Sequence, residues 1–253
     1  MKLQDSVIAI TGGGQGLGRA MAEYLAAKGA RLALIDLMED KLAEAAEACK
    51  LAGGDAKTYV CNVAKEEDVE TTFQAIINDF GHLNGLVNNA GILRDGLMVK
   101  FKDGKLEKRM ELAQRQSVID VNLTGVFLCG REAATRMIEN GDQGAIINIA
   151  SISRAGNMGQ SNYSAAKAGA SALVPVWAKE LARYGIRCMG IAPGFIETEM
   201  TASMKPEALE KMTAGIPLKR MGKPEEIASA VAFIFENDYV SGRMIEVDGA
   251  LRL

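Results

Sequence analysis

A tyrosine and a lysine one helical turn apart, Tyr163 and Lys167, are the residues whose types and spacing point most directly to chemistry. At positions i and i+4 of a helix both side chains lie on one face, so the Lys167 ammonium can stabilise a phenolate at Tyr163. A phenol with a pKa of about 10 exchanges protons poorly at neutral pH, and a nearby cation lowers that pKa. The pair predicts proton exchange with an alcohol or carbonyl oxygen. The same spacing also fits a solvent-facing pair on an ordinary helix.

A glycine-rich loop follows the first apolar run of the chain. This run, 6–11, is rich in β-branched residues and predicts a buried strand. It leads into Gly12-Gly13-Gly14-Gln15-Gly16-Leu17-Gly18. Glycines let the backbone approach a phosphate, and a helix beginning near Leu17 points its free N–H groups at that anion. Because the loop lacks the Lys-Ser/Thr end of a P-loop, it predicts a phosphate-bearing ligand and argues against ATP hydrolysis. The alternative is a glycine-rich turn with no ligand.

An acidic residue ends the next apolar run, 31–36. Asp36 lies about twenty residues after the glycine loop, where a dinucleotide fold places the acid that binds the adenosine ribose. A 2′-phosphate would meet this negative charge, and Gln15 offers no compensating cation, so we expect NAD to be preferred to NADP. Arg19 and Arg31 lie nearby in sequence and limit that expectation. The alternative for Asp36 is an ordinary acid closing a strand.

With these sites in view, the chain resembles the short-chain dehydrogenase/reductases over essentially its whole length. Five ordered motifs carry the resemblance: Thr11-Gly12 to Gly18, Asn88-Asn89-Ala90-Gly91, Val121-Asn122-Leu123-Thr124-Gly125, Ser151 with Tyr163 and Lys167, and Ala192-Pro193-Gly194-Phe195-Ile196-Glu197-Thr198. The segments 163–169, 193–198 and 247–249 are most similar to the 3-oxoacyl-acyl-carrier-protein reductase branch. The resemblance implies hydride transfer between a nicotinamide and a ketone or secondary alcohol.

The resemblance assigns four catalytic residues, Asn122, Ser151, Tyr163 and Lys167. It makes Tyr163 the acid in reduction and the base in oxidation, while Ser151 holds the substrate oxygen. Lys167 would hold the nicotinamide ribose and lower the tyrosine pKa. Asn122 would position a water that relays protons to Lys167, or its side chain would tie two helices together. Ser153 is the alternative serine, and the spacing to the tyrosine favours Ser151.

The resemblance also implies the residues that bind the cofactor. Thr198 is expected at the carboxamide and Asn62-Val63 beside the adenine, although the family often has Asp at the position of Asn62. The full set is Gly12, Gln15, Gly16, Leu17, Gly18, Asp36, Asn62, Val63, Asn89, Ala90, Gly91, Tyr163, Lys167, Pro193, Gly194, Ile196 and Thr198.

Composition narrows the class of protein. The 253 residues carry a net charge of −3 with both signs dispersed, so nothing suggests nucleic-acid or membrane binding. Four cysteines are widely spaced and predict no metal site, and a single histidine, His82, argues against a Ser-His-Asp hydrolase. The amino terminus goes straight into a predicted strand without a signal-peptide pattern, so we expect a cytoplasmic protein.

Apolar runs alternate with helical patterns along the chain. Strands are expected at 6–11, 31–36, 57–61, 84–88, 144–149, 186–192 and 243–247, with helices such as 38–51, 66–80 and 224–235 between them. This alternation predicts a single α/β domain over 1–253, a Rossmann-type doubly wound parallel sheet. The resemblance gives the strand order 3-2-1-4-5-6-7. It also implies a homotetramer built on the helices around Asn122 and Tyr163 and on the C-terminal segment.

Two further segments of the chain border the expected substrate site of the 3-oxoacyl-acyl-carrier-protein reductase branch. The segment 93–116 is longer than usual and rich in bases, which indicates either a solvated helix face or extended loop, or a basic border of the substrate entrance or a subunit interface. The segment 198–217, with Met200, Met204, Met212 and Ile216, is expected to be a mobile lid over an apolar substrate.

Three functions fit the residues. The first is an NAD(H)-dependent oxidoreductase of a 3-oxoacyl or 3-hydroxyacyl thioester, carried by CoA or by an acyl carrier protein. The second keeps the chemistry and changes the substrate to another secondary alcohol, such as a steroid, sugar or diol. The third is a nucleotide-binding regulator without turnover, which the presence of all four catalytic side chains disfavours.

Overall fold

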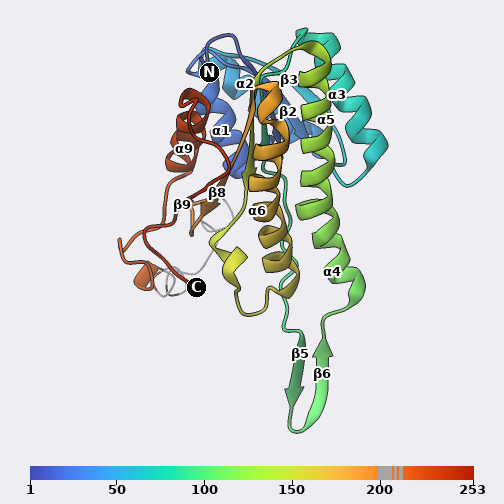
Figure 1. Cartoon of the computed structure of the whole chain (residues 1–253). Coiled ribbons are helices and arrows are strands. Elements are labelled where there is room, and N and C mark those ends of the chain that lie inside the picture. The colour runs from blue at the N-terminus through green and yellow to red at the C-terminus, as the bar shows by residue number, and fades with distance from the viewer. Residues whose placement is uncertain (199–206, 208–209, 211–212) are drawn as a thin grey trace.

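A seven-stranded parallel sheet forms the centre of the molecule, with helices on both faces (Figure 1). The structure is a computed structural model that describes residues 1–198, 207, 210 and 213–253. The sheet order is β3-β2-β1-β4-β7-β8-β9. The strands are β1 Val7–Thr11, β2 Arg31–Asp36, β3 Asp55–Val60, β4 Gly85–Asn88, β7 Gly144–Ile149, β8 Ile186–Pro193 and β9 Met244–Val247.

This arrangement confirms the expected fold. Counted without the two strands of a separate hairpin, the order is the predicted 3-2-1-4-5-6-7, and each strand lies within about two residues of its predicted position. All pairings in the sheet are parallel. The carboxyl ends of the strands therefore meet at one edge, where a doubly wound fold binds its ligand.

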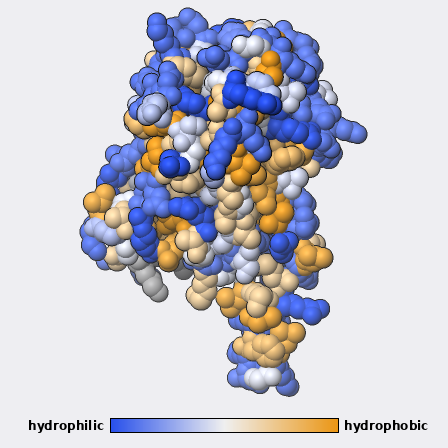
Figure 2. Space-filling model, viewed as in Figure 1, coloured by the Kyte–Doolittle hydropathy of each residue, from blue (hydrophilic) through white to orange (hydrophobic). Residues whose placement is uncertain are grey.

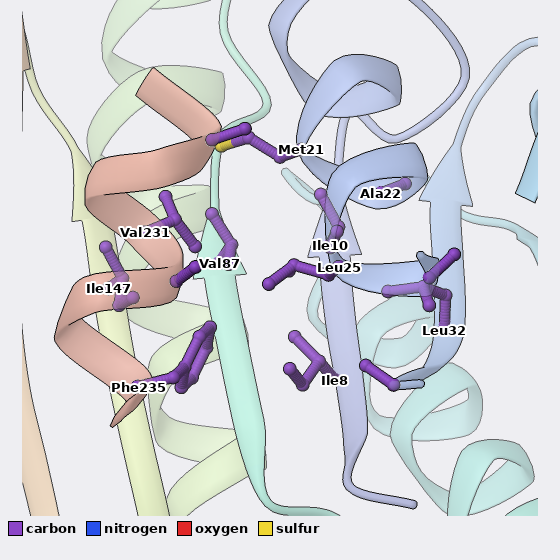
Figure 3. Close-up of a cluster of buried hydrophobic side chains, with 14 of the residues drawn as sticks. Ile8, Ile10, Met21, Ala22, Leu25, Leu32, Val87, Ile147, Val231 and Phe235 are labelled. Carbon is purple, nitrogen blue, oxygen red and sulfur yellow. The ribbon is translucent and has the colours of Figure 1, made fainter. Parts of the chain in front are cut away.

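Both faces of the sheet are buried, and this explains the continuous apolar runs in the sequence. In β1 every residue is buried, with Ile8 and Ile10 in one core cluster and Val7 and Ala9 in the other. Figure 3 shows the first cluster, in which Met21 and Leu25 of α1 and Val231 and Phe235 of α9 pack against the sheet.

Two layers of helices cover these faces. One layer consists of α1 Gly16–Ala26, α2 Glu39–Leu51 and α9 Pro224–Glu236, and the other of α3 Glu66–Phe80, α5 Gly125–Asn140 and α6 Ser161–Leu181 (Figure 1). The helix α4 Leu112–Ile119 runs into α5 through a π-helical turn, Asp120–Thr124, that contains Asn122. Such turns are rare and concentrate at functional sites.

The segment between β4 and α4 contains a β-hairpin. Its strands are β5 Val99–Lys102 and β6 Lys105–Arg109, which pair in antiparallel fashion and project away from the body of the molecule (Figure 1). Neither a helix face nor an extended loop describes this segment, so the simpler of our two expectations for 93–116 was wrong. The Asp103-Gly104 turn, with φ of 50° and 74°, closes the hairpin.

The C-terminal residues close a small third cluster. Leu251 is buried against Ile152, Ile216 and Met221, and Arg252 forms ion pairs with Glu246 and Asp248. The chain therefore ends beside Ile152, the residue that follows Ser151. No helix among the described residues is long and apolar enough to cross a membrane. In the same part of the chain, no cluster of acidic, histidine and cysteine side chains could hold a metal ion.

Candidate active site

The glycine loop turns sharply between β1 and α1. Gly12 and Gly16 have φ of +64° and +54°, which residues with a side chain rarely adopt. At Gly18 an added Cβ would lie 1.9 Å from the carbonyl oxygen of Gly12. Gly18 therefore packs the first turn of the helix against the loop. The loop brings the N-terminus of α1 to the carboxyl edge of the sheet, a suitable place for a phosphate.

Hydrogen bonds from the end of β1 fasten this loop to the next strand end. The Thr11 hydroxyl accepts from the backbone N–H groups of Asn89 and Ala90, each at 3.0 Å. The Asn89 amide donates to the carbonyl oxygens of Thr11 and Gly12, each at 3.1 Å. Asn89 thus holds the shape of the loop. Thr11 is a positioning residue that the sequence showed only as part of a motif.

A cavity of about 590 Å³ opens beside the loop, a size typical of small-ligand sites. Eleven of the predicted cofactor residues line it: Gly12, Gln15, Gly16, Leu17, Asp36, Asn62, Val63, Asn89, Ala90, Gly91 and Thr198. Sequence reasoning missed six others, which are mainly apolar: Ile35, Leu37, Met38, Cys61, Ile92 and Val121. Gly18, Pro193, Gly194 and Ile196 are not among its lining residues, and neither are Tyr163 and Lys167.

Asp36 lies in the wall of the cavity with its carboxylate held by the backbone. It accepts from the N–H groups of Gly14 at 3.2 Å, Leu37 at 2.7 Å and Met38 at 3.2 Å. The two arginines near in sequence point elsewhere, since Arg19 pairs with Glu23 and Glu44, and Arg31 with Asp55. Both arginines are therefore engaged by other carboxylates.

Asn62 and Val63 also line the cavity. The Asn62 side chain accepts from the N–H of Ala64 at 3.0 Å, a bond that an aspartate would make equally well. Val63 packs so closely on α5 that a Cβ added at Gly125 would lie 2.9 Å from its side chain. The replacement of the family's Asp by Asn62 thus preserves the local turn.

Ser151, Tyr163 and Lys167 come together as the sequence predicts. Ser151 begins a short 3-10 turn, Ile152–Ala155, and its hydroxyl accepts from the N–H of Ser153 at 3.1 Å. The same side chain lies near enough to Tyr163 to lower the pKa of the phenol. Ser151 is half-buried whereas Ser153 is buried, which favours Ser151 as the serine that meets a substrate. The Lys167 ammonium lies 5.6 Å from the centre of the Tyr163 ring.

Burial dominates the acid–base properties of this trio. It lowers the pKa of the Lys167 ammonium to about 8, and the ammonium donates to the carbonyl oxygen of Ile149 at 2.7 Å. The pKa of Tyr163 is raised by burial and, more weakly, by the charge of Asp95, while the hydrogen bond from Ser151 lowers it. The expected net lowering of the tyrosine pKa by Lys167 is therefore not found, because desolvation of the phenolate outweighs the favourable contacts.

Asn122 has both ends of its side chain bound to one residue. Its Oδ1 accepts from the N–H of Ile92 at 2.9 Å, and its Nδ2 donates to the carbonyl oxygen of Ile92 at 3.1 Å. It ties the π-helical turn to the segment after β4, which corrects the expectation of a link between two helices. The amide has a second N–H and a second lone pair, so these bonds are compatible with a water for the predicted proton relay.

The base of the hairpin contacts the loop before Tyr163. Gly96 N–H donates to the carbonyl oxygen of Gly159 at 2.8 Å, and Gln160 donates to the Asp95 carboxylate at 2.9 Å. Asn162, next to Tyr163, donates to the carbonyl oxygen of Arg94 at 2.8 Å. Asp95 is a charged neighbour of the phenol that sequence reasoning missed, because no motif includes it.

The segment after β8 approaches the site from the other side. Gly194 donates to the carbonyl oxygen of Val247 at 2.9 Å, and Ile196 forms a bridge with Gly222. Thr198 reaches the cavity. Most of the expected lid, with Met200, Met204 and Met212, lies outside the described residues. Ile216 at its end is buried beside Ile152.

The comparisons with known proteins agree with this geometry. A family described as "Enoyl-(Acyl carrier protein) reductase" matches residues 12–251. A human 3-oxoacyl-[acyl-carrier-protein] reductase is 42% identical, with 98% of this chain and 99% of the relative covered. The chain belongs to the short-chain dehydrogenase/reductase family. Its match to such reductases makes it an oxidoreductase that acts on CH–OH groups.

Other members of the short-chain dehydrogenase/reductase family show the same likeness. A 3-oxoacyl-[acyl-carrier-protein] reductase of Thermotoga maritima is 37% identical, with 99% of each chain covered. A solved structure of a putative gluconate dehydrogenase from Agrobacterium tumefaciens superposes with a TM-score of 0.89 at 36% identity, covering 99% of this chain and 97% of that one. An NAD+-bound xylitol dehydrogenase superposes with a TM-score of 0.88 at 28% identity, covering 99% and 100%.

Proposed function

We propose that this protein interconverts a 3-oxoacyl thioester and its 3-hydroxyacyl partner with a nicotinamide dinucleotide as hydride carrier. The proposal is carried by the grouping of half-buried Ser151 and Tyr163 with the buried Lys167, whose ammonium lies 5.6 Å from the centre of the tyrosine ring. The names of the curated relatives support the thioester, since several of them are 3-oxoacyl-[acyl-carrier-protein] reductases. The substrate would be carried by CoA or by an acyl carrier protein.

The protein's own groups handle the substrate oxygen. In reduction, the Ser151 hydroxyl and the Tyr163 phenol would both bind the carbonyl oxygen, and Tyr163 would give it a proton as the carbonyl carbon gains a hydride. Since the pKa of Tyr163 is raised, the phenol keeps its proton at neutral pH and is ready to act as an acid. A bound nicotinamide dinucleotide supplies or accepts the hydride. This protonation state suits Tyr163 to the role of the acid in the reduction.

The cavity suits a dinucleotide on its own geometry. Two left-handed glycines and the N-terminus of α1 fit a phosphate at one side, and the Asp36 carboxylate fits ribose hydroxyls at another. We infer NAD as the cofactor, with NADP disfavoured by the charge of Asp36. Lys167 and Thr198 would hold the nicotinamide end, and Pro193, Gly194 and Ile196 would shape the loop beside it.

Two further parts of the proposal follow from resemblance to the family. They are a homotetramer and a location in the cytoplasm. Light scattering of the purified protein tests the first, and fractionation of cells tests the second.

Steady-state turnover of acetoacetyl-CoA, followed by the absorbance of the reduced nicotinamide, tests the function. Oxidation of NADH by this substrate is the expected result. Turnover with NADPH alone would contradict the cofactor inference and leave the acyl substrate standing. No turnover with either cofactor would overturn the thioester, and the polyol and sugar-acid dehydrogenases among the similar structures make a sugar or diol the next substrate to test.

A further inference from the structure

The hairpin 99–109 has two chemically different faces. Cross-strand neighbours share a face, and the pairs are Phe101 with Leu106, Val99 with Arg109, Lys100 with Lys108, and Lys102 with Lys105. One face is therefore apolar apart from the arginine at its base, and the other consists of lysines. Glu107 joins the lysine face through an ion pair with Lys100.

Within the part of the chain that the structure describes, no other element covers the strands of the hairpin. Every residue of both strands is exposed, with Phe101 at 63% and Leu106 at 51%. Two strands alone are marginally stable in water and need packing on one face. Exposed lysines need no explanation, but large apolar side chains gathered on one face of a strand pair indicate a contact surface.

The apolar face continues onto the body of the molecule. In Figure 2, hydrophobic colours lie over the upper part of the hairpin, whose tip is blue and white, and continue upward over α6 and α5. Exposed apolar side chains on the neighbouring helices include Leu112 at the start of α4, Phe127 on α5 and Val176 on α6. Along α6, the residues Ala165, Ala168 and Ala172 are also exposed, and such small side chains allow another helix to approach closely.

The size of this combined surface suits a second copy of the chain. The helices α5 and α6 have 16 and 21 residues. At 1.5 Å per residue and a width of about 10 Å each, they give a flat footprint of about 500 Å². The hairpin extends this footprint by about 15 Å along the strands. A stable dimer covers about 800 Å² per partner, so the hairpin brings the surface close to the required area.

We propose that the hairpin is a clasp between two copies of this chain, its apolar face covered by the second copy that packs on α5 and α6. The clasp adds a specific contact to the homo-oligomer of the proposed function, and it rests on that oligomer. The lysine face points away from the covered side and stays in solvent, so association buries no lysine charge. A two-fold axis gives each copy one clasp, and each copy holds the other.

Matched substitutions on the two faces test the clasp. Phe101→Asn with Leu106→Asn changes one cross-strand pair on the apolar face, and Lys102→Asn with Lys105→Asn changes the neighbouring pair on the lysine face. Light scattering over a dilution series measures the dissociation constant between copies. We expect the first variant to raise it at least about thirtyfold, as for loss of a hot spot, and the second to change it less than about threefold.

Excision of the hairpin provides a second variant that spares the body of the protein. The N–H of Met110 donates to the carbonyl oxygen of Met98 at 3.0 Å, so an Asn-Gly turn can join these residues in place of 99–109. Circular dichroism should show an unchanged fold, and association should weaken as in the apolar-face variant. A monomeric wild-type protein at micromolar concentration would overturn both the oligomer and the clasp.

Other outcomes would overturn the clasp alone. An oligomer whose dissociation constant is the same in the wild type, the apolar-face variant and the excision variant would show that the hairpin is not part of the interface. If the lysine-face variant instead lost reduction of an acyl-carrier-protein substrate while reducing acetoacetyl-CoA normally, the hairpin would be a docking site for an acidic carrier. The first of these results does not depend on the identity of the preferred substrate.

Discussion

At Tyr163, burial and the charge of Asp95 raise the pKa of the phenol, and the hydrogen bond from Ser151 lowers it. Asp95→Asn removes the negative charge and should lower the tyrosine pKa. Because the phenolate is the base in alcohol oxidation, the rise of kcat/KM with pH should move to lower pH in the variant. The pH profile of oxidation measures this. Asp103→Asn, at the exposed tip of the hairpin, should leave the profile unchanged, and an equal shift in both variants would contradict a local effect of Asp95.

Removal of the Tyr163 hydroxyl separates catalysis from binding. Tyr163→Phe should lower kcat by about a hundredfold to ten-thousandfold, since the substrate oxygen loses its proton donor. Dinucleotide binding, measured by calorimetry, should persist because the cavity is lined by other residues. Full activity in this variant would mean that a group other than Tyr163 donates the proton.

The charge of Asp36 can be removed while one of its acceptor oxygens is kept. Asp36→Asn retains an oxygen for the N–H groups of Leu37 and Met38 and removes the repulsion of a 2′-phosphate. We expect the ratio of kcat/KM for NADPH to that for NADH to rise about tenfold. Asp55→Asn, which changes an acid paired with Arg31, serves as the control. An unchanged ratio would mean that Asp36 does not face the ribose.

Sequence patterns identify functional residues that lie at fixed spacings along the chain. They miss residues that are distant in sequence and come together only in the folded structure. Asp36, Asn89 and Ser151 lie at strand ends where their types imply a role. Asp95 acts on Tyr163 from 68 positions away through the hairpin base, and no local pattern encodes that distance. The net effect on the tyrosine pKa also depends on burial, which only the packed structure supplies.

At the junction of the glycine loop with α1, Gly18 has no room for a side chain. Gly18→Ala would put a methyl group 1.9 Å from the Gly12 carbonyl oxygen, so the helix must shift. We expect the free energy of unfolding to fall by about 1–3 kcal/mol and dinucleotide binding to weaken. Chemical denaturation measures the first and calorimetry the second. At Gly96 an added methyl meets only the end of the Gln114 side chain, so Gly96→Ala is the control.

The five central strands of the sheet, β2, β1, β4, β7 and β8, could be predicted because burial on both faces leaves a continuous apolar run in each. The hairpin is different, since it is exposed on both faces and its bases suggested a solvated helix. Its signal was present in the sequence all the same. Val99-Lys100-Phe101-Lys102 alternates with period two, and Asp103-Gly104 is the residue pair that a two-residue hairpin turn favours. The many basic residues of the segment favoured the interpretation as a solvated helix over this alternation.

For the whole molecule, the buried Lys167 makes stability depend on pH. Its pKa in the fold is about 8, below the ordinary 10.5, so the folded state binds fewer protons than the unfolded state between these values. Stability conferred by this site therefore rises as pH increases through that window, and the cost of burying the charge is fully present below it. The shift corresponds to about 3 kcal/mol.

The comparison with Lys167→Met isolates this effect, because other titrating groups cancel in the difference. At pH 7 the variant should be the more stable protein by about 3 kcal/mol, and its advantage should shrink as the pH approaches 10.5. Urea denaturation at several pH values measures both curves. A constant difference across the range would mean that the ammonium is not desolvated in the folded protein.

The two ends of the chain differ in how well they would tolerate an attached tag or fusion partner. The amino group of Met1 donates to the carbonyl oxygen of Phe235 at 2.7 Å, at the end of α9 and remote from the carboxyl edge of the sheet (Figure 1). The carboxyl end packs through Leu251 onto Ile152, the neighbour of Ser151. An affinity tag, a fusion partner or a tether to a solid support should therefore be joined at Met1. The same addition after Leu253 would disturb the packing of Leu251 on Ile152, next to Ser151.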